Sequence, residues 1–192
     1  MASLAELTGR LDPAAASESR AEDAEGLRAA VAAIMREHEG RPELLFIKRA
    51  DREDDPWSGH MAFPGGRKQA TDRSLLHTAQ RETLEEVGLD LTKGCRVVAR
   101  LPDVMPYSRM PHPLTVTAFL FVMHERATLT LNEEVAAVVW APLEGVLRGE
   151  GATKFRWQKD GLDLTLPAID VEGNVVWGLT YRMIELMREV MP

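Results

Sequence analysis

The chain has 192 residues, of which 45% are hydrophobic and 28% are charged, and its formal net charge is −7. This composition is typical of a globular protein with one good core, and the acidic balance excludes broad, non-specific binding to nucleic acid or to an anionic membrane. An anionic substrate is still allowed, because a local basic pocket or a bound cation can outweigh the global charge.

Residues 1–24 are predicted to form a short helix and a polar connector. Leu4, Leu7 and Leu11 recur at helical spacing, which indicates an amphipathic N-terminal helix. The following stretch, DPAAASESRAEDAEG, is rich in Ala, Ser and charged residues, as expected for a connector. Residues 25–192 are then expected to form a single domain.

A β-hairpin is predicted next. Residues 27–37 (LRAAVAAIMRE) have helix propensity, but their neighbours favour a strand: EGRP is typical of a turn, and residues 43–50 (ELLFIKRA) have the apolar centre of a second strand. A charged loop, DREDDPWSG, and a short strand, HMAF, ended by Pro64, complete this part of the chain.

The pattern from Ser74 to Val87 predicts a helix. Ser74 or Asp72 can cap its start, and Gly88 is a natural terminator. The apolar positions that we expect to share much of one face are Leu75, Ala79, Leu84 and Val87.

The second half of the chain alternates strands and loops before a last helix. Strands are predicted at 95–101, 114–123 and 135–143, short strands and turns at 153–178, and an amphipathic helix at 179–191. The proline-rich loop between the first two strands is not expected to form regular structure. Mixed strands and helices around one core predict an α+β or α/β fold with a mixed sheet.

Three glutamates crowd together near the end of the helix predicted from Ser74 to Val87. Glu82, Glu85 and Glu86 stand three and four residues apart, so their carboxylates project to one region. Like charges at that spacing repel by about a few tenths of a kcal/mol each. A hard divalent cation such as Mg²⁺ or Mn²⁺ would reverse that effect, since it takes carboxylate oxygens as ligands. For an isolated ExxEE motif, a solvated acidic helix face is the alternative.

Two glycines precede this helix. Gly65 and Gly66 permit backbone geometry closed to other residues and allow the main chain to approach a ligand or metal closely. A plain turn is the usual meaning of Gly-Gly, but here the loop leads directly into the helix that carries the carboxylates.

The stretch resembles the signature of the Nudix hydrolase family: Gly, five residues, Glu, seven residues, then Arg-Glu-aliphatic-any-Glu-Glu-any-Gly-aliphatic. RETLEEVGL (Arg81–Leu89) fits the second half, with Thr83 at the aliphatic position. Asp72 stands five residues after Gly66 in place of Glu, and eight residues rather than seven separate Asp72 from Arg81. This expanded box, at about residues 66–89, and the FPGG before it are similar to the coenzyme A pyrophosphatase branch.

The resemblance implies an α/β fold, a Nudix-type α/β/α sandwich with a mixed central sheet, and a metal-dependent pyrophosphohydrolase. Glu82, Glu85 and Glu86 would bind Mg²⁺ or Mn²⁺, with the Gly66 carbonyl as a further ligand. Arg81 would orient a glutamate by ion pairing. The general base, which takes the proton of the attacking water, would be one of three glutamates: Glu82, Glu133 or Glu134.

Residues that could contact substrate lie around this box. Arg49, like Lys48, ends a strand and could meet phosphate oxygens. Trp57 and Tyr107 are loop aromatics, of which Trp57 could stack on a base, and Gly65 permits close approach of the main chain. The coenzyme A branch usually carries an arginine and a histidine where this chain has Asp55 and Trp57.

Several substrates are therefore compatible with the box. A coenzyme A-like substrate is favoured, and ADP-ribose, NADH and nucleoside triphosphates are alternatives. A non-catalytic, nucleotide-sensing Nudix module is the alternative from another functional class, although such modules typically lose carboxylates that this chain retains.

The cellular setting is inferred from three features. Cys95 is the only cysteine, so an internal disulfide is impossible and a reducing compartment is indicated. The N-terminal residues carry charge too early for a signal peptide, and no apolar run approaches the roughly 20 residues that span a bilayer. We expect a cytoplasmic protein with a small-molecule nucleotide substrate, no membrane association and no stable nucleic-acid binding. Dimers are common in the family, which leaves a homodimer open.

Overall fold

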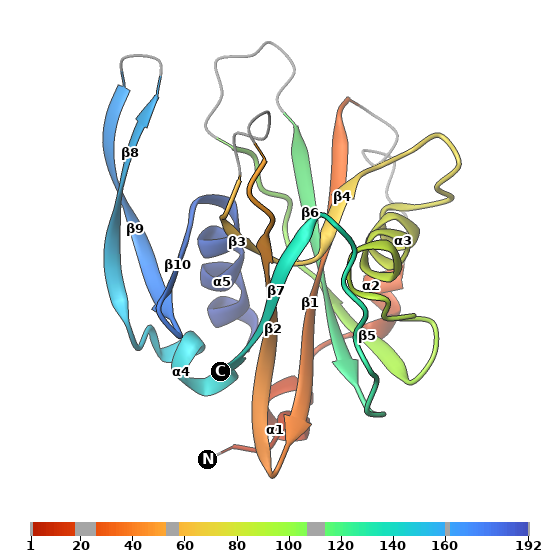
Figure 1. Cartoon of the computed structure of the whole chain (residues 1–192). Helices are drawn as coiled ribbons and strands as arrows, with labels where there is room; N and C mark the ends of the chain where they lie inside the picture. The colour runs from red at the N-terminus through yellow and green to blue at the C-terminus, as the bar shows by residue number, and fades with distance from the viewer. Residues whose placement is uncertain (1, 18–25, 53–57, 107–113, 160–161, 192) are drawn as a thin grey trace.

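The computed structural model describes residues 2–17, 26–52, 58–106, 114–159 and 162–191 (Figure 1). Within these residues the chain forms two sheets and five helices, in the following order: α1 (Leu4–Thr8), α2 (Pro13–Ser17), β1 (Arg28–His38), β2 (Arg41–Arg49), β3 (Met61–Ala62), β4 (Gly65–Arg67), α3 (Leu75–Val87), β5 (Cys95–Arg100), β6 (Thr115–Met123), β7 (Val135–Pro142), α4 (Leu143–Arg148), β8 (Ala152–Lys159), β9 (Leu162–Val171), β10 (Asn174–Trp177) and α5 (Gly178–Val190).

The larger sheet is mixed and has seven strands, with the order β3-β2-β1-β6-β5; β4 pairs with β1 and β7 pairs with β2. β1 is parallel to β6 and antiparallel to β2 and β4. The hairpin between β1 and β2 turns at Glu39 and Gly40, whose φ angles of 51° and 73° are those of a primed two-residue turn. The predicted hairpin is confirmed.

The sheet is covered on both faces because its central strands bury both of their sides. Leu44 and Phe46 of β2 pack with residues of α1, α4 and α5, whereas Leu45 and Ile47 pack with α3. Successive side chains of a strand point to opposite faces, so the uninterrupted apolar run of β2 is the pattern of a strand between two helical layers. Figure 1 shows this arrangement, with α3 and α5 on opposite sides of the sheet. The predicted α/β/α sandwich is confirmed.

The smaller sheet, β8-β9-β10, is an antiparallel meander beside the main sheet. Strands were predicted between residues 153 and 178, and they are longer than expected, because β8 and β9 pair over eight residues. β10 runs directly into α5, so the meander sets where this helix begins. The helix predicted at 179–191 is confirmed.

Local differences from the sequence prediction concern short elements. α1 ends at Thr8, before Leu11, and α2 lies within the segment predicted as a connector. α4 begins at the last residue of the strand predicted at 135–143 and continues into residues for which no element was predicted. Leu4 and Leu7 are buried in the core shared with α5. The proposed division of the chain near residue 24 stays a prediction.

The face of α3 was predicted correctly except at Leu84, which is 50% exposed. Leu75, Ala79 and Val87 are buried as expected. Thr83 takes the inward place, since its hydroxyl donates to the Ala79 carbonyl at 2.7 Å and so needs no other partner in the core. Ser74 caps the helix through the His77 N–H, and Gly88 ends it with φ 70°.

No helix of the described residues is long and apolar enough to cross a membrane.

Replacement of Phe46 tests the core beneath the sheet. Phe46 is fully buried and stacks on Phe63 with ring centroids 5.2 Å apart. Phe46→Ala is expected to lower the free energy of unfolding by about 3–5 kcal/mol, because it leaves a cavity. Leu84→Ala, on the exposed face of α3, should change it by less than about 0.5 kcal/mol. Urea unfolding of both variants checks the difference, and equal losses would contradict this assignment of the two faces.

Candidate active site

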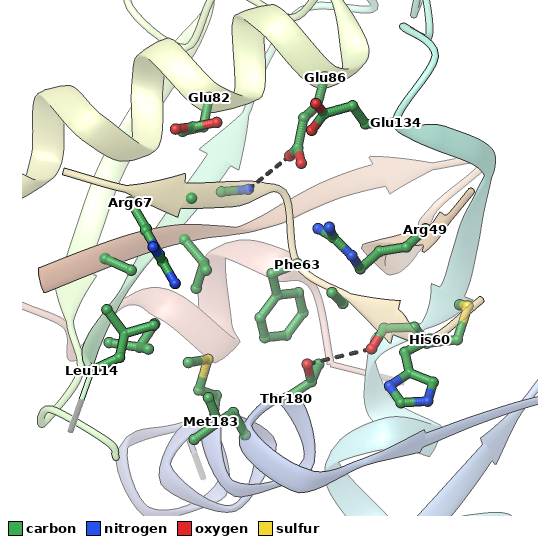
Figure 2. Close-up of a pocket in the computed structure, with 18 of the residues that line it drawn as sticks. Arg49, His60, Phe63, Arg67, Glu82, Glu86, Leu114, Glu134, Thr180 and Met183 are labelled. Carbon is green, nitrogen blue, oxygen red and sulfur yellow. Dashed lines mark hydrogen bonds between the residues drawn. The ribbon is translucent and has the colours of Figure 1, made fainter. Parts of the chain in front are cut away.

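A pocket of about 700 Å³ opens between α3, β4 and the start of α5. Glu82 and Glu86 of α3 form its acidic side, together with Glu134 from the residue before β7 (Figure 2). Arg49, at the end of β2, and Arg67, at the end of β4, also line it. The structure therefore brings together residues from four separate segments of the chain.

β4 is the element that fixes the acidic side. Gly65 and Gly66 pair antiparallel with Val31 and Ala30 of β1. Gly65 has φ 151°, and a Cβ at this position would lie 2.3 Å from the Ala30 carbonyl oxygen. Only glycine fits there. The segment interpreted from the sequence as a loop is therefore a short strand, and its close approach is to β1.

Glu86 is tied to this strand. The Gly65 N–H donates to its carboxylate at 2.8 Å (dashed in Figure 2), and Glu86 is only 2% exposed. Burial raises the pKa of Glu86 to about 8, against the Gly65 hydrogen bond, which lowers it; the nearby charges of Glu82 and Glu134 raise it further. The surroundings of Glu86 therefore stabilise its ionised form poorly.

Glu82 lies against Gly66. A Cβ on Gly66 would be 2.5–2.8 Å from the Glu82 carboxylate atoms, so the second glycine leaves room for this side chain. Burial also raises the pKa of Glu82, while its hydrogen bond with Arg81 lowers it. Glu85 is more exposed and turns to the Arg81 guanidinium at 3.1 Å.

Arg81 is clamped by Asp72. Its Nε and Nη2 atoms each donate to one Asp72 oxygen at 2.9 Å, and Nη1 reaches Glu82 at 2.9 Å. Asp72 also accepts bonds from the Thr78 hydroxyl and the Gln69 N–H. These donors, Arg81 first, hold the pKa of Asp72 well below its usual range. Arg81 therefore pairs with Glu82 and Glu85, and its role in orienting a glutamate stays a prediction. Asp72 anchors Arg81, while Ser74 caps α3.

The chemistry of the site fits a hard divalent cation. The donor set consists of carboxylate oxygens, which Mg²⁺ and Mn²⁺ prefer. Glu86 is a buried carboxylate that accepts a hydrogen bond from the neutral Gly65 N–H, and the charge of Arg49 offsets its burial only in part. In the described residues no three His, Cys, Asp or Glu side chains already converge on one point; Glu82 and Glu85 both pair with Arg81. The ligand roles of Glu82, Glu85, Glu86 and Gly66 stay predictions.

The two candidate bases before β7 differ in position. Glu134 lines the pocket, and Figure 2 shows its carboxylate beside that of Glu86. The Glu133 side chain is 88% exposed and does not line the pocket. Arg52 approaches both carboxylates at 3.5 Å. The structure thus favours Glu134 over Glu133.

Two predicted contacts, Trp57 and Tyr107, lie outside the described residues. Conversely, the sequence analysis missed pocket residues from distant segments: Arg67, Gln69, Leu114, Asn132, Trp177, Leu179, Thr180 and Met183. Residues near the C-terminus gave no local signal, because only the meander and α5 carry them to the pocket.

Comparisons with known proteins agree with this geometry. A sequence model of the NUDIX domain matches residues 26–160. The chain is 41% identical over 119 residues to an uncharacterised protein of Schizosaccharomyces pombe, covering 60% of this chain but only 36% of that protein. It is 33% identical over 150 residues to the mitochondrial coenzyme A diphosphatase NUDT8 of Mus musculus, covering 77% of this chain and 70% of that protein.

A solved structure shows the same fold. The chain superposes on a C. elegans Ap4A hydrolase binary complex with a TM-score of 0.53 at 21% identity, over 64% of this chain and 84% of that one.

Removal of the buried charge should change the pH dependence of stability. In metal-free protein, unfolded Glu86 ionises near its ordinary pKa of 4.5, while folded Glu86 ionises near 8. Folded protein then binds the extra proton between these values, so wild-type stability falls as pH rises from about 4.5 to 8.

Glu86→Gln lacks this loss and keeps an oxygen for the Gly65 N–H. It is expected to exceed wild type at pH 8 by on the order of 4 kcal/mol and to match it near pH 4.5. Urea unfolding in a chelator measures this. Glu133→Gln removes the same charge from an exposed position as the control, and a constant offset between Glu86→Gln and wild type at all pH values would refute the assignment.

The two glycines should respond differently to alanine. Gly65→Ala places a methyl group against the β1 backbone, so we expect a loss of several kcal/mol in unfolding free energy. Gly66→Ala meets only the end of the Glu82 side chain, which can swing aside. It should leave the unfolding midpoint nearly unchanged but weaken Mn²⁺ binding about 10- to 100-fold. Calorimetric Mn²⁺ titration checks this, and unaltered Mn²⁺ affinity would contradict it.

Proposed function

The chain belongs to the Nudix family, and we propose that it is a pyrophosphohydrolase that cleaves the diphosphate of a nucleoside diphosphate linked to another group, with Mg²⁺ or Mn²⁺ as cofactor. The observation that carries this proposal is the burial of Glu86 beside Glu82 and Glu134, on the acidic side of a pocket that also holds two arginines. Crowded carboxylates are costly without a cation.

Different residues of the pocket would have different roles in the reaction. Glu82 and Glu86, with Glu85 released from Arg81, would hold the cation, which neutralises diphosphate charge and lowers the pKa of a bound water. Arg49 and Arg67 would bind the phosphate oxygens through guanidinium hydrogen bonds. Arg81 keeps its clamp on Asp72 and positions the carboxylates beside it.

Glu134 is the general base that the geometry supports best. It faces the pocket next to Glu86, and its side chain is 44% exposed, so water can reach it. Glu82 is held by Arg81 at 2.9 Å, a closer ion pair than that of Glu134 with Arg52 at 3.5 Å, so the Glu134 carboxylate is freer to turn toward a water. Glu134 would take the proton of the attacking water.

A coenzyme A-like substrate is the first choice. The similarity to the mouse coenzyme A diphosphatase, the expanded box and the FPGG motif support this choice. ADP-ribose, NADH and nucleoside triphosphates are the alternatives, since Asp55 and Trp57 stand where the coenzyme A branch usually has other residues. Against a non-catalytic sensing module stands the retention of all three box glutamates. A cytoplasmic location and a homodimer stay predictions.

Hydrolysis by purified protein tests the proposal. Coenzyme A, ADP-ribose, NADH and nucleoside triphosphates are incubated with Mg²⁺ or Mn²⁺, and products are identified by mass. We expect cleavage of coenzyme A to 4′-phosphopantetheine and adenosine 3′,5′-bisphosphate. Glu86→Gln should lower kcat at least about 100-fold, and Glu134→Gln by about 10²–10⁴-fold.

Glu133→Gln is the matched control for the base, because Glu133 is the adjacent glutamate and lies outside the pocket. A larger loss in Glu133→Gln than in Glu134→Gln would transfer the base to Glu133. Absence of turnover on every substrate, with Mn²⁺ still bound, would refute hydrolysis and favour the sensing module.

A further inference from the structure

The pocket has a second, chemically different end. Part of its lining is apolar and comes from β6, α5 and the loops that precede β4 and β6. These side chains belong to, or pack against, one hydrophobic cluster and are here called the apolar end: Phe63, Leu114, Val116, Leu179 and Met183. Figure 2 shows Phe63, Leu114 and Met183 on the side of the pocket away from Glu82 and Glu86. A volume of about 700 Å³ extends well beyond what a diphosphate alone needs.

The apolar end offers little to a hydroxyl-rich ligand. Phe63, Val116 and Met183 are buried, and each presents only carbon or sulfur atoms. Two polar side chains, Thr180 and His60, line the pocket close to one another, and the Thr180 hydroxyl donates to the Met61 carbonyl at 3.4 Å (dashed in Figure 2). The hydroxyl groups of a sugar placed here would lose their hydrogen bonds to water and gain no equivalent bonds from the side chains of the apolar end, which is unfavourable. An aliphatic group would instead be stabilised by burial.

Two arginines lie between the two ends. Figure 2 shows the guanidinium groups of Arg49 and Arg67 on opposite sides of the pocket, below the carboxylates and level with or above Phe63. A phosphate held by these groups would direct its substituent toward the apolar end. The pocket therefore orders three kinds of contact along one line: carboxylates, guanidinium groups and apolar side chains.

This order matches one class of phosphate ester. In pantetheine phosphate the second carbon after the ester oxygen carries two methyl groups, so a branched aliphatic segment follows the phosphate directly. In ADP-ribose or a dinucleotide a hydroxylated ribose stands at that place. We propose that the apolar end binds the pantetheine arm of a coenzyme A-type substrate, with Leu114 and Met183 selecting it against ribose; this inference rests on the proposed function and specifies its substrate.

Two phosphate monoesters that differ only in the arm provide the test. Binding of 4′-phosphopantetheine and of ribose 5-phosphate is measured by calorimetry on the full chain with Mg²⁺, where neither compound has a diphosphate to cleave. Wild type is expected to bind 4′-phosphopantetheine at least tenfold more tightly. Met183→Gln and Leu114→Asn should each reduce that preference about tenfold, mainly by weakening 4′-phosphopantetheine.

Matched variants separate polarity from packing. Met183→Leu keeps the site apolar and should retain the preference. Leu84→Asn repeats the leucine-to-asparagine change on the exposed face of α3 and should also retain it. Met183 is buried, so Met183→Gln could unfold the protein; Leu114 is only partly buried, and Leu114→Asn then carries the test.

Each result decides the inference separately from the proposed function. Equal binding of the two esters by wild type overturns it, and so does a preference that survives both polar substitutions. If the variants bind adenosine 3′,5′-bisphosphate more weakly but bind 4′-phosphopantetheine as wild type does, the nucleotide lies at the apolar end, and this result also overturns the inference. If wild type prefers 4′-phosphopantetheine but cleaves no diphosphate, the apolar end stands and hydrolysis fails.

Discussion

The site depends on the hydrogen bond between the Gly65 N–H and the buried Glu86 carboxylate. It joins β4 to α3, and since β4 pairs with β1, it sets the helix against the central sheet. One N–H is weak compensation for a buried charge, which is why burial dominates the pKa of Glu86. The hydrogen bond that positions α3 therefore also keeps Glu86 buried, where a bound proton or cation would stabilise its carboxylate.

On the outer side of α3, Arg81 has the opposite effect: it stabilises the ionised form of the carboxylates that it contacts. Its fork on Asp72 uses two donors in a geometry that suits carboxylates, and its remaining nitrogen reaches Glu82 and Glu85. Asp is one methylene shorter than Glu, and one extra residue separates Asp72 from Arg81 compared with the usual spacing. Despite these two departures from the family signature, Asp72 meets the Arg81 guanidinium directly.

Much of this architecture could be predicted from sequence because the signals are local. The β1–β2 hairpin, the Ser74 cap and the Gly88 terminus follow from residue types at defined spacings. Leu84 was misplaced because hydrophobicity alone favoured it, whereas the self-satisfied Thr83 hydroxyl allowed a polar residue to be buried instead. β4 was missed because a three-residue strand with two glycines has no measurable period.

The far side of the pocket could not be predicted, for a topological reason. Leu114 and Met183 are separated by most of the C-terminal half of the chain, and their meeting depends on β6 lying parallel to β1 while the meander returns α5 to the same face. The acidic side lies within a short sequence motif, but the apolar side is assembled by the fold, and so related chains can keep the same carboxylates while changing the group that lies opposite them.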